Sequence, residues 1–218
     1  MKTALIGNGA MGKLIADLLR NANHEIFITI DESDSALTAA QLAEKFSGAE
    51  VAIDFSSAEA VVRNIEACLI AGTAIVEGTT GWNDQREFVR KMVEDHNGSM
   101  VFGANFSVGV NLFYRITDIA AALFAEFKDY EAFIEERHHS RKKDAPSGTA
   151  LKLKEIVEKS IGSGFSVAAT RAGNIPGTHI VGFDGIADTI ELTHTARSRE
   201  GFAAGAVVAA EWIVGRKG

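Results

Sequence analysis

The feature that most constrains the fold is a regular alternation of short apolar runs and helix-like segments in the first half of the chain. The apolar runs cover residues 3–6, 26–30, 51–55, 73–77 and 100–103. The segments between them have the apolar spacing and the length of helices. Such alternation indicates a parallel, doubly wound sheet, and ligands of these sheets bind at the carboxyl ends of the strands.

A glycine motif follows the first of these runs. Residues Gly7, Asn8, Gly9, Ala10, Met11 and Gly12 read Gly-x-Gly-x-x-Gly between a strand and a helix. The motif by itself is weak, but Asp31 ends the second strand about 20 residues later, where a carboxylate can hold a ribose hydroxyl. Asp31 could otherwise cap a turn or a helix. The spacing favours the ribose role, and the pattern predicts a Rossmann-type dinucleotide fold.

Further loops follow the remaining strands. Phe55, the stretch Gly78–Thr80 and the stretch Ala104–Phe106 all stand at expected strand ends, so they should converge on one cofactor. Residues 78–81 could also form an ordinary turn, and only their position after a strand argues otherwise. Ser56 or Ser57 is expected to cap the helix that runs to Ala71.

The second half of the chain has a different rhythm. A long helix is expected over residues 108–127, and one further helix over 149–161 interrupts strands at 131–139, 165–171, 179–183 and 188–196. This order predicts a smaller α+β domain with a mixed or antiparallel sheet. Residues 191–195 alternate cleanly, so the sheet should have two unlike faces, one of them packed on a partner subunit.

The final segment, 202–214, is rich in small residues and should form a helix that returns to cover the first sheet. The nucleotide domain is then discontinuous. The expected boundaries are 1–105 plus 197–218 for the dinucleotide-binding domain, and 106–196 for a substrate-binding and oligomerisation domain.

A basic loop joins a strand to a helix in the second domain. The stretch from His138 to Thr149 gathers two of the six histidines, one of the two prolines and the cations Arg141, Lys142 and Lys143. A helix N-terminus beside these cations suits a small carboxylate or dicarboxylate, and His138 can exchange a proton near neutral pH. The alternative is a capped helix start beside a solvated charge run.

Composition excludes several other classes. With 22 basic and 29 acidic residues the net charge is −7, which gives no support to nucleic-acid binding. Cys68 is the only cysteine and lies in an apolar helix pattern, so it is expected to pack rather than react, in a reducing cytoplasm. No apolar run approaches the roughly 20 residues of a membrane span, and the first residues do not form a signal peptide.

Five motifs together resemble the dihydrodipicolinate reductase (4-hydroxy-tetrahydrodipicolinate reductase) family of lysine synthesis. They are residues 78–81 (GTTG), 105–111 (NFSVGVN), 138–149 (HHSRKKDAPSGT), 171–179 (RAGNIPGTH) and 198–206 (SREGFAAGA). The resemblance spans nearly the whole chain. It implies NAD(P)H-dependent reduction of 4-hydroxy-tetrahydrodipicolinate to tetrahydrodipicolinate in lysine and diaminopimelate biosynthesis, by a homotetramer assembled through its second-domain sheets.

The resemblance also implies roles for single residues. His138 corresponds to a catalytic histidine and Lys142 to a proton donor, while His139, Gly148 and Thr149 would hold a substrate carboxylate. The implied nucleotide contacts are Gly7, Asn8, Gly9, Ala10, Met11, Gly12, Asp31, Gly78, Thr79, Thr80, Gly103, Ala104, Asn105 and Phe106. Because Asp31 and Glu32 would repel a 2′-phosphate, NADH is expected to be preferred over NADPH. No metal is expected.

The chain departs from the family pattern in three places. Its glycine loop is one residue shorter and has Ala10 where many members have Arg, so a phosphate contact is missing or moves to Lys13. The segment 161–165 is short, and the extension that usually follows the Trp-containing helix is missing. Three rivals stay open: another Rossmann reductase of a small carboxylate, a non-catalytic NAD(P) sensor, and a metal hydrolase using His138 or His139. Neighbouring residues of a strand point to opposite faces, which argues against the last.

Overall fold

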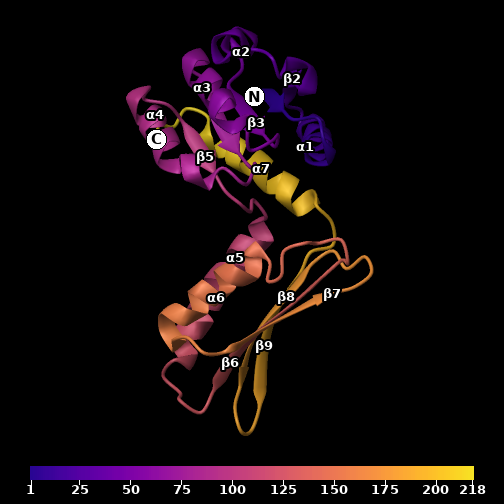
Figure 1. Cartoon of the computed structure of the whole chain (residues 1–218), viewed down its shortest axis with the longest axis vertical. Coiled ribbons are helices and arrows are strands. Elements are labelled where there is room, and N and C mark those ends of the chain that lie inside the picture. The colour runs from indigo at the N-terminus through magenta and orange to yellow at the C-terminus, as the bar shows by residue number, and fades with distance from the viewer. The chain divides into compact units, whose positions relative to one another are not determined.

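The computed structural model describes all residues from Met1 to Gly218. The chain divides into two compact units, one made of Met1–Ser107 with Glu200–Gly218 and the other of Val108–Arg199 (Figure 1). The first unit is therefore built from both ends of the chain, and each unit has its own sheet and its own core.

The first unit contains a five-stranded parallel sheet in the order β2-β1-β3-β4-β5. Its strands are β1 (Lys2–Ile6), β2 (Glu25–Ile30), β3 (Val51–Asp54), β4 (Ala74–Glu77) and β5 (Met100–Phe102). Its α-helices are α1 (Ala10–Asn21), α2 (Ala39–Phe46), α3 (Val61–Ala71), α4 (Arg86–Asp95) and α7 (Glu200–Ile213), with 3₁₀ turns η1 (Glu32–Asp34) and η2 (Asn83–Gln85).

Alternate strand residues face two separate cores. Ile6, Ala52 and Ile75 pack against buried side chains of α2, α3 and α4. Leu5, Ile53 and Val76 pack on the other side against α1 and α7. Small residues of α7 permit close packing, since a Cβ atom at Gly205 would lie 1.7 Å from the Phe106 carbonyl oxygen. The final helix thus covers the first sheet, as predicted.

The second unit contains a mixed sheet in the order β7-β6-β8-β9. Its strands are β6 (Glu131–His138), β7 (Ser166–Arg171), β8 (Thr178–Asp184) and β9 (Thr189–Thr195), and its helices are α5 (Val108–Phe124) and α6 (Gly148–Ile161). The β6–β7 pair is parallel and the other pairs are antiparallel. Ile134, Val181 and Phe183 form a core with α5 and α6. A Rossmann-type sheet with a second, mixed-sheet α+β unit confirms the predicted fold class.

Two local predictions are wrong. Neither Ser56 nor Ser57 caps α3, because a turn precedes the helix and its N-cap position is Ala60, without a side-chain cap. The Ser56 N–H instead donates to the Asp54 carboxylate at 2.8 Å. The long helix α5 ends at Phe124 rather than at residue 127. No helix of the chain has both the length and the apolar character of a membrane span.

Candidate active site

The glycine loop leaves the N-terminus of α1 open. Gly7 has φ +98°, and a Cβ atom there would lie 2.4 Å from the Phe55 carbonyl oxygen. A Cβ at Gly12 would lie 2.0 Å from the Gly7 carbonyl oxygen, so this position must be glycine for the helix to pack. Gly9 has no atom within 4 Å of such a Cβ and is an N-cap without a side-chain hydrogen bond. The free N–H groups of the first turn can therefore receive a phosphate.

A cleft of about 670 Å³ lies at this edge of the sheet. It is lined by the glycine loop, the end of β2 and the loop after β3, including Gly7, Asn8, Gly9, Asp31, Phe55, Ser56 and Arg63. The next loops join it: the Phe55 ring occupies the space over Gly78, and the Phe106 ring meets Phe55 edge-on at 6.1 Å. The structure thus brings together the loops in which nucleotide contacts were predicted.

Asp31 serves in this structure as the N-cap of η1. Its Oδ1 accepts hydrogen bonds from the Ser33 N–H at 2.9 Å and from the Ser33 hydroxyl at 2.7 Å. The hydrogen bonds from Ser33 hold the pKa of Asp31 below its usual value. The capping role considered for Asp31 is therefore real, and the carboxylate remains charged at the edge of the cleft.

Arg63 of α3 also reaches this cleft, which the sequence did not predict. Its Nη1 donates to the Ser35 carbonyl oxygen at 2.5 Å and to the Leu37 carbonyl oxygen at 3.3 Å. Its Nε and Nη2 donate to the Asn64 side-chain oxygen at 3.3 and 3.1 Å. The guanidinium is thus used to hold the segment after Asp31.

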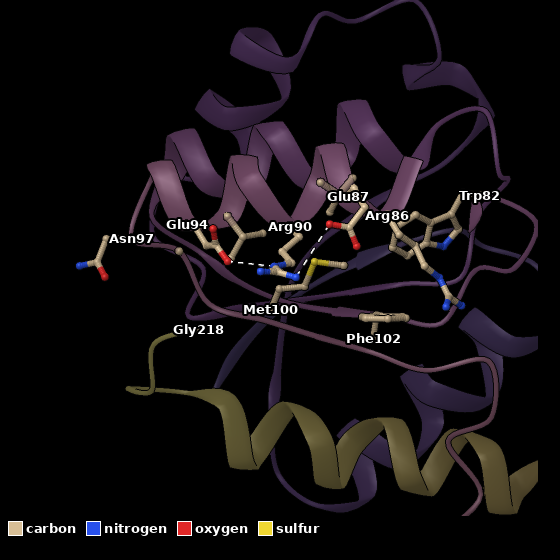
Figure 2. A pocket seen from close by; sticks show the side chains of 12 residues that line it. Trp82, Arg86, Glu87, Arg90, Glu94, Asn97, Met100, Phe102 and Gly218 are labelled. Carbon is tan, nitrogen blue, oxygen red and sulfur yellow. Dashed lines mark hydrogen bonds and ion pairs between the residues drawn. The ribbon is translucent and has the colours of Figure 1, made fainter. Parts of the chain in front are cut away.

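A larger groove of about 690 Å³ lies elsewhere in the first unit, beside β5 (Figure 2). Trp82, Phe102 and Met100 line it together with α4, and Arg90 forms exposed ion pairs with Glu87 and Glu94. None of the predicted site residues lines this groove, so its size does not identify it as the active site.

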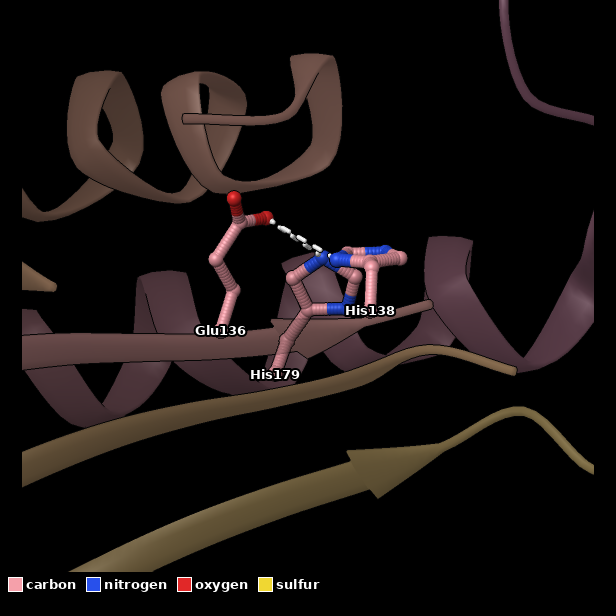
Figure 3. A group of neighbouring side chains, drawn as sticks. All are labelled: Glu136, His138 and His179. Carbon is pink, nitrogen blue, oxygen red and sulfur yellow. Dashed lines mark ion pairs between the residues drawn. The ribbon is translucent and has the colours of Figure 1, made fainter. Parts of the chain in front are cut away.

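The second unit holds a buried Glu-His-His cluster on neighbouring strands. Glu136 and His138 lie on β6, and His179 lies on β8 (Figure 3). One carboxylate oxygen, Oε2 of Glu136, lies 3.5 Å from Nδ1 of His138 and 3.5 Å from Nε2 of His179. The two rings meet edge-on at 5.0 Å. Antiparallel register pairs Glu136 with His179 and so fixes this arrangement.

Glu136 is the anchor of the cluster. Its other oxygen, Oε1, accepts from the Ser147 N–H at 2.9 Å and from Nη2 of Arg171 at 2.5 Å. Burial by itself raises the pKa of Glu136, but the hydrogen bonds from Ser147 and Arg171 outweigh it and hold the pKa below its usual value. Glu136 is therefore a carboxylate whose charge is balanced by Arg171.

Both histidines of the cluster are neutral near pH 7. Burial lowers the pKa of His138, although Glu136 opposes this shift. Burial and the neighbouring His138 lower the pKa of His179 to about 4. Nε2 of His179 lies 3.2 Å from the Ser147 hydroxyl oxygen, which accepts from the Ala150 N–H and caps α6. The cluster thus fixes the N-terminus of α6.

Of the other predicted site residues, Gly148 and Thr149 form this helix start, while His139 and Lys142 lie in the loop that precedes it. Lys142 is a quarter exposed and forms an ion pair with Asp144 at 2.8 Å. Gly148 is the first residue of α6, and a Cβ there would meet open space. Thr149 follows in the first turn and hydrogen-bonds with Tyr114. Sequence reasoning named no role for Glu136, Arg171 or His179, although two-residue alternation along β6 already placed 136 and 138 on one face.

The residue types of this cluster are also those of a metal site. The ligand atoms of Glu136, His138 and His179 lie within 4.8 Å of one another, and these residue types bind zinc. Arg171 already neutralises the carboxylate, however, and Lys142 adds to the positive potential at His138. These cations disfavour a metal ion and favour an anion.

Both units of the chain match known proteins. A model of the N-terminal part of dihydrodipicolinate reductase matches residues 1–106, and a model of its C-terminal part matches residues 109–218. The 4-hydroxy-tetrahydrodipicolinate reductase of Christiangramia forsetii is 36% identical over 232 residues, covering 100% of this chain and 94% of that protein. The Methanosarcina barkeri enzyme of the same name is 40% identical, covering 79% of this chain and 71% of that protein.

A solved structure agrees at the level of the fold. The dipicolinate-bound dihydrodipicolinate reductase of Paenisporosarcina sp. TG-14 superposes with a TM-score of 0.81 at 21% identity, over 98% of this chain and 95% of that one. The family models and the named relatives confirm the resemblance stated from the motifs. Since the two family models together account for nearly every residue, this chain belongs to the dihydrodipicolinate reductase family.

Proposed function

We propose that this protein catalyses the NAD(P)H-dependent reduction of 4-hydroxy-tetrahydrodipicolinate to tetrahydrodipicolinate, a step of lysine and diaminopimelate biosynthesis. Family membership supports the reaction, and the relatives that match over most of the chain carry this name. The structural observation that carries the proposal is the helix start at Gly148, held by the Glu136 cluster beside a neutral His138 and the Lys142 ammonium.

The substrate is a ring with two carboxylates, and the proposed site offers matching donors. The first-turn N–H groups of α6 at Gly148 and Thr149, the Thr149 hydroxyl and His139 together receive one carboxylate. Each charge-assisted hydrogen bond contributes about 1.5 to 3 kcal/mol. The Paenisporosarcina relative is described as dipicolinate-bound, and dipicolinate is a planar dicarboxylate of the same size.

Reduction of the ring requires a hydride and a proton. Loss of the 4-hydroxyl group as water leaves a ring carbon conjugated with the C=N bond, and a bound dihydronicotinamide would supply the hydride to that carbon. Negative charge then develops on the conjugated system, and the Lys142 ammonium delivers the proton while nearby cations stabilise the charge. His138, kept neutral by burial, supplies a hydrogen bond to the reacting ring.

The residues of the first unit fit a pyridine dinucleotide. The open Gly9 and the uncapped start of α1 suit its pyrophosphate, and the loops at 78–80 and 103–106 suit its nicotinamide half. We assign the ribose hydroxyls to Asp31 and expect NADH to be preferred. Arg63, the only cation lining the cleft, uses its donors on the Ser35 carbonyl oxygen and on the Asn64 side-chain oxygen. Lys13 and Arg20 line a neighbouring hollow of about 470 Å³ with Asp31. Because Arg20 already pairs with Asp17, we assign contact with a 2′-phosphate to Lys13.

Assembly as a cytoplasmic homotetramer is part of the proposal. The face of the second sheet turned away from α5 and α6 carries Phe133, whose ring lies over Gly182. Helix α5 also exposes an apolar stripe of Leu112, Ile116, Ile119 and Leu123. Apolar surface of this kind commonly packs on another subunit.

A coupled assay tests the reaction. Dihydrodipicolinate synthase generates the substrate in situ, and oxidation of NADH is followed at the nicotinamide band. Oxidation that depends on both enzymes supports the proposal, whereas oxidation with other small carboxylates only would identify a different reductase. Binding of NADH without any turnover would identify a sensor. Dialysis against EDTA should leave the rate unchanged, and a loss restored by zinc would show that the reaction depends on a metal ion.

A further inference from the structure

Two buried carboxyl groups lie side by side in the first unit, at the ends of neighbouring strands. Asp54 ends β3 and Glu77 ends β4, and the parallel register places them directly opposite each other on the same face of the sheet. Asp54 is 0% exposed and Glu77 is 1% exposed. Two ionised carboxylates in contact without a cation are strongly unfavourable in a buried site, so the pair should carry a proton.

The hydrogen bonds of the pair locate this proton on Glu77. Asp54 accepts from the Ser56 N–H at 2.8 Å and from the Asn64 side-chain amide at 2.8 Å, which are the contacts of a carboxylate. Oε1 of Glu77 accepts from the Thr79 N–H at 2.7 Å, whereas Oε2 of Glu77 is buried and has no donor. A proton on Oε2 supplies the missing partner, because Glu77 and Asp54 are in hydrogen-bonding contact.

No cation contacts the pair directly. The Arg63 guanidinium donates to the Asn64 side-chain oxygen, and the Asn64 amide in turn donates to Asp54. The helix packed against it contributes Asn64 and Cys68, and the strands on either side contribute Ile6 of β1 and Phe102 of β5. Burial, together with the negative charge of the pair, raises the pKa of the Cys68 thiol. Burial and the charge of Asp54 raise the pKa of Glu77 to about 9. A single proton is therefore retained at neutral pH.

The loops held by this pair are those proposed to hold the dinucleotide. Ser56 follows β3 and lines the 670 Å³ cleft with Gly7, Gly9 and Asp31. Thr79 follows β4, and its hydroxyl oxygen accepts from the Ser56 N–H at 3.1 Å. The carboxyl pair thus fixes both loops from beneath, through the Ser56 and Thr79 backbone N–H groups.

We infer that Asp54 and Glu77 are positioning residues for the dinucleotide, and that their shared proton locks the loops after β3 and β4 in the binding conformation. The inference rests on the proposed binding of NADH by these loops. Loss of the proton at alkaline pH places two negative charges together, separates the pair and releases the loops. NADH binding should therefore weaken above about pH 9, by several-fold.

Isosteric variants separate the two carboxyl groups. Glu77→Gln keeps an acceptor for Thr79 and a donor for Asp54 without a titrating proton. Asp54→Asn places an amide N–H₂ against donors from Asn64 or from Glu77, so the hydrogen bonds of the pair cannot all form. Glu66→Gln makes the same replacement on the exposed side of α3 and serves as the control.

The measurement is NADH affinity by fluorescence titration from pH 7 to pH 10, with folding checked by thermal unfolding. At pH 7.5, Glu77→Gln and Glu66→Gln should bind within about twofold of the parent, and Asp54→Asn at least fivefold more weakly. Above pH 9 the parent and Glu66→Gln should lose affinity while Glu77→Gln does not. An alkaline loss that persists in Glu77→Gln, or unchanged binding by a folded Asp54→Asn, would overturn the inference.

Failure of the proposed cofactor and failure of the carboxyl-pair inference give different results. A parent protein that shows no NADH binding at any pH refutes the proposed cofactor rather than the carboxyl pair. If Asp54→Asn does not fold, the alkaline loss of NADH affinity in the parent, compared with Glu77→Gln, still tests the inference. Their thermal midpoints provide a second readout: the parent midpoint should fall relative to that of Glu77→Gln as the pH rises from 6 to 9, because only the parent must retain a proton that its unfolded chain has released.

Discussion

The Glu136 carboxylate on β6 and the Arg171 guanidinium on β7 form an ion pair with 2.5 Å between Oε1 and Nη2. The Glu136 side chain is fully buried, and Arg171 is 16% exposed. The same guanidinium nitrogen also donates to the Asp144 carbonyl oxygen at 2.5 Å. One pair therefore connects two strands of the second sheet to the basic loop before α6.

Removal of one partner of this pair should be costly. Arg171→Met leaves Glu136 as a buried charge without a counterion, and we expect a loss of about 3 kcal/mol in the free energy of unfolding. The double variant Arg171→Met/Glu136→Gln removes the buried charge as well and should recover most of the lost free energy of unfolding. Thermal or urea unfolding of both variants measures the difference. A double variant less stable than the single one would show that Glu136 does not require its counterion.

The low pKa of His179, about 4, makes the second unit acid-sensitive. An imidazole takes up a proton near pH 6.5 in the unfolded chain but resists protonation in the folded one. This contribution to stability is complete above pH 6.5 and is lost as the pH falls towards 4. His179→Gln should therefore show a smaller fall in thermal midpoint between pH 7 and pH 4.5 than the parent. An equal fall in both proteins would place the acid sensitivity elsewhere.

Turnover should depend on Lys142 and His138. Replacement of either by Ala should lower kcat by on the order of a hundredfold. Lys142→Ala loses the proton donor, and His138→Ala loses the imidazole that hydrogen-bonds to the reacting ring. NADH affinity should hardly change. Lys143→Ala, which removes an adjacent exposed ammonium, is the matched control and should keep nearly full activity. Full kcat in Lys142→Ala with only a higher KM would show that Lys142 binds substrate and does not donate the proton.

Inhibition by 2,6-pyridinedicarboxylate tests the helix start. This planar dicarboxylate should compete with substrate, and Thr149→Val should raise its inhibition constant by about tenfold or more, since a charge-assisted hydrogen bond is lost. Ser160→Ala, at the exposed far end of α6, controls for general effects on the helix. An unchanged constant in Thr149→Val would remove the Thr149 side chain from the site.

The cofactor preference should follow the charge at Asp31. Two adjacent acids should disfavour NADPH by roughly 1 to 2 kcal/mol, a five- to thirtyfold ratio in kcat/KM at low ionic strength. Asp31→Ser/Glu32→Arg should move this ratio towards NADPH. The Ser33 hydrogen bonds that hold Asp31 are lost in the variant, so its NADH affinity should fall as well. A parent that prefers NADPH would show that Asp31 does not select the ribose.

Local sequence patterns were sufficient to predict most helices and strands and the fold class. The alternation of strands and helices in residues 1–103, and the change of rhythm after residue 127, reflect periodicities that each segment carries by itself. The position of Gly7, Gly9 and Gly12 between a strand and a helix likewise determined their loop, because close backbone approaches leave no room for side chains at Gly7 and Gly12. Motif resemblance then indicated the family, which the comparisons confirm.

Only the tertiary structure decided which residues meet across the sheets. Glu136 and His179 are far apart in sequence and are joined by antiparallel register, and Asp54 meets Glu77 through parallel register. Arg63 reaches the segment after Asp31 because α3 packs beside it. The charge state of a buried group depends on such long-range neighbours, since burial and hydrogen bonding set its pKa. The sequence places His138 and Glu77 at the ends of expected strands, but only the fold determines that one is a neutral imidazole and the other a protonated acid.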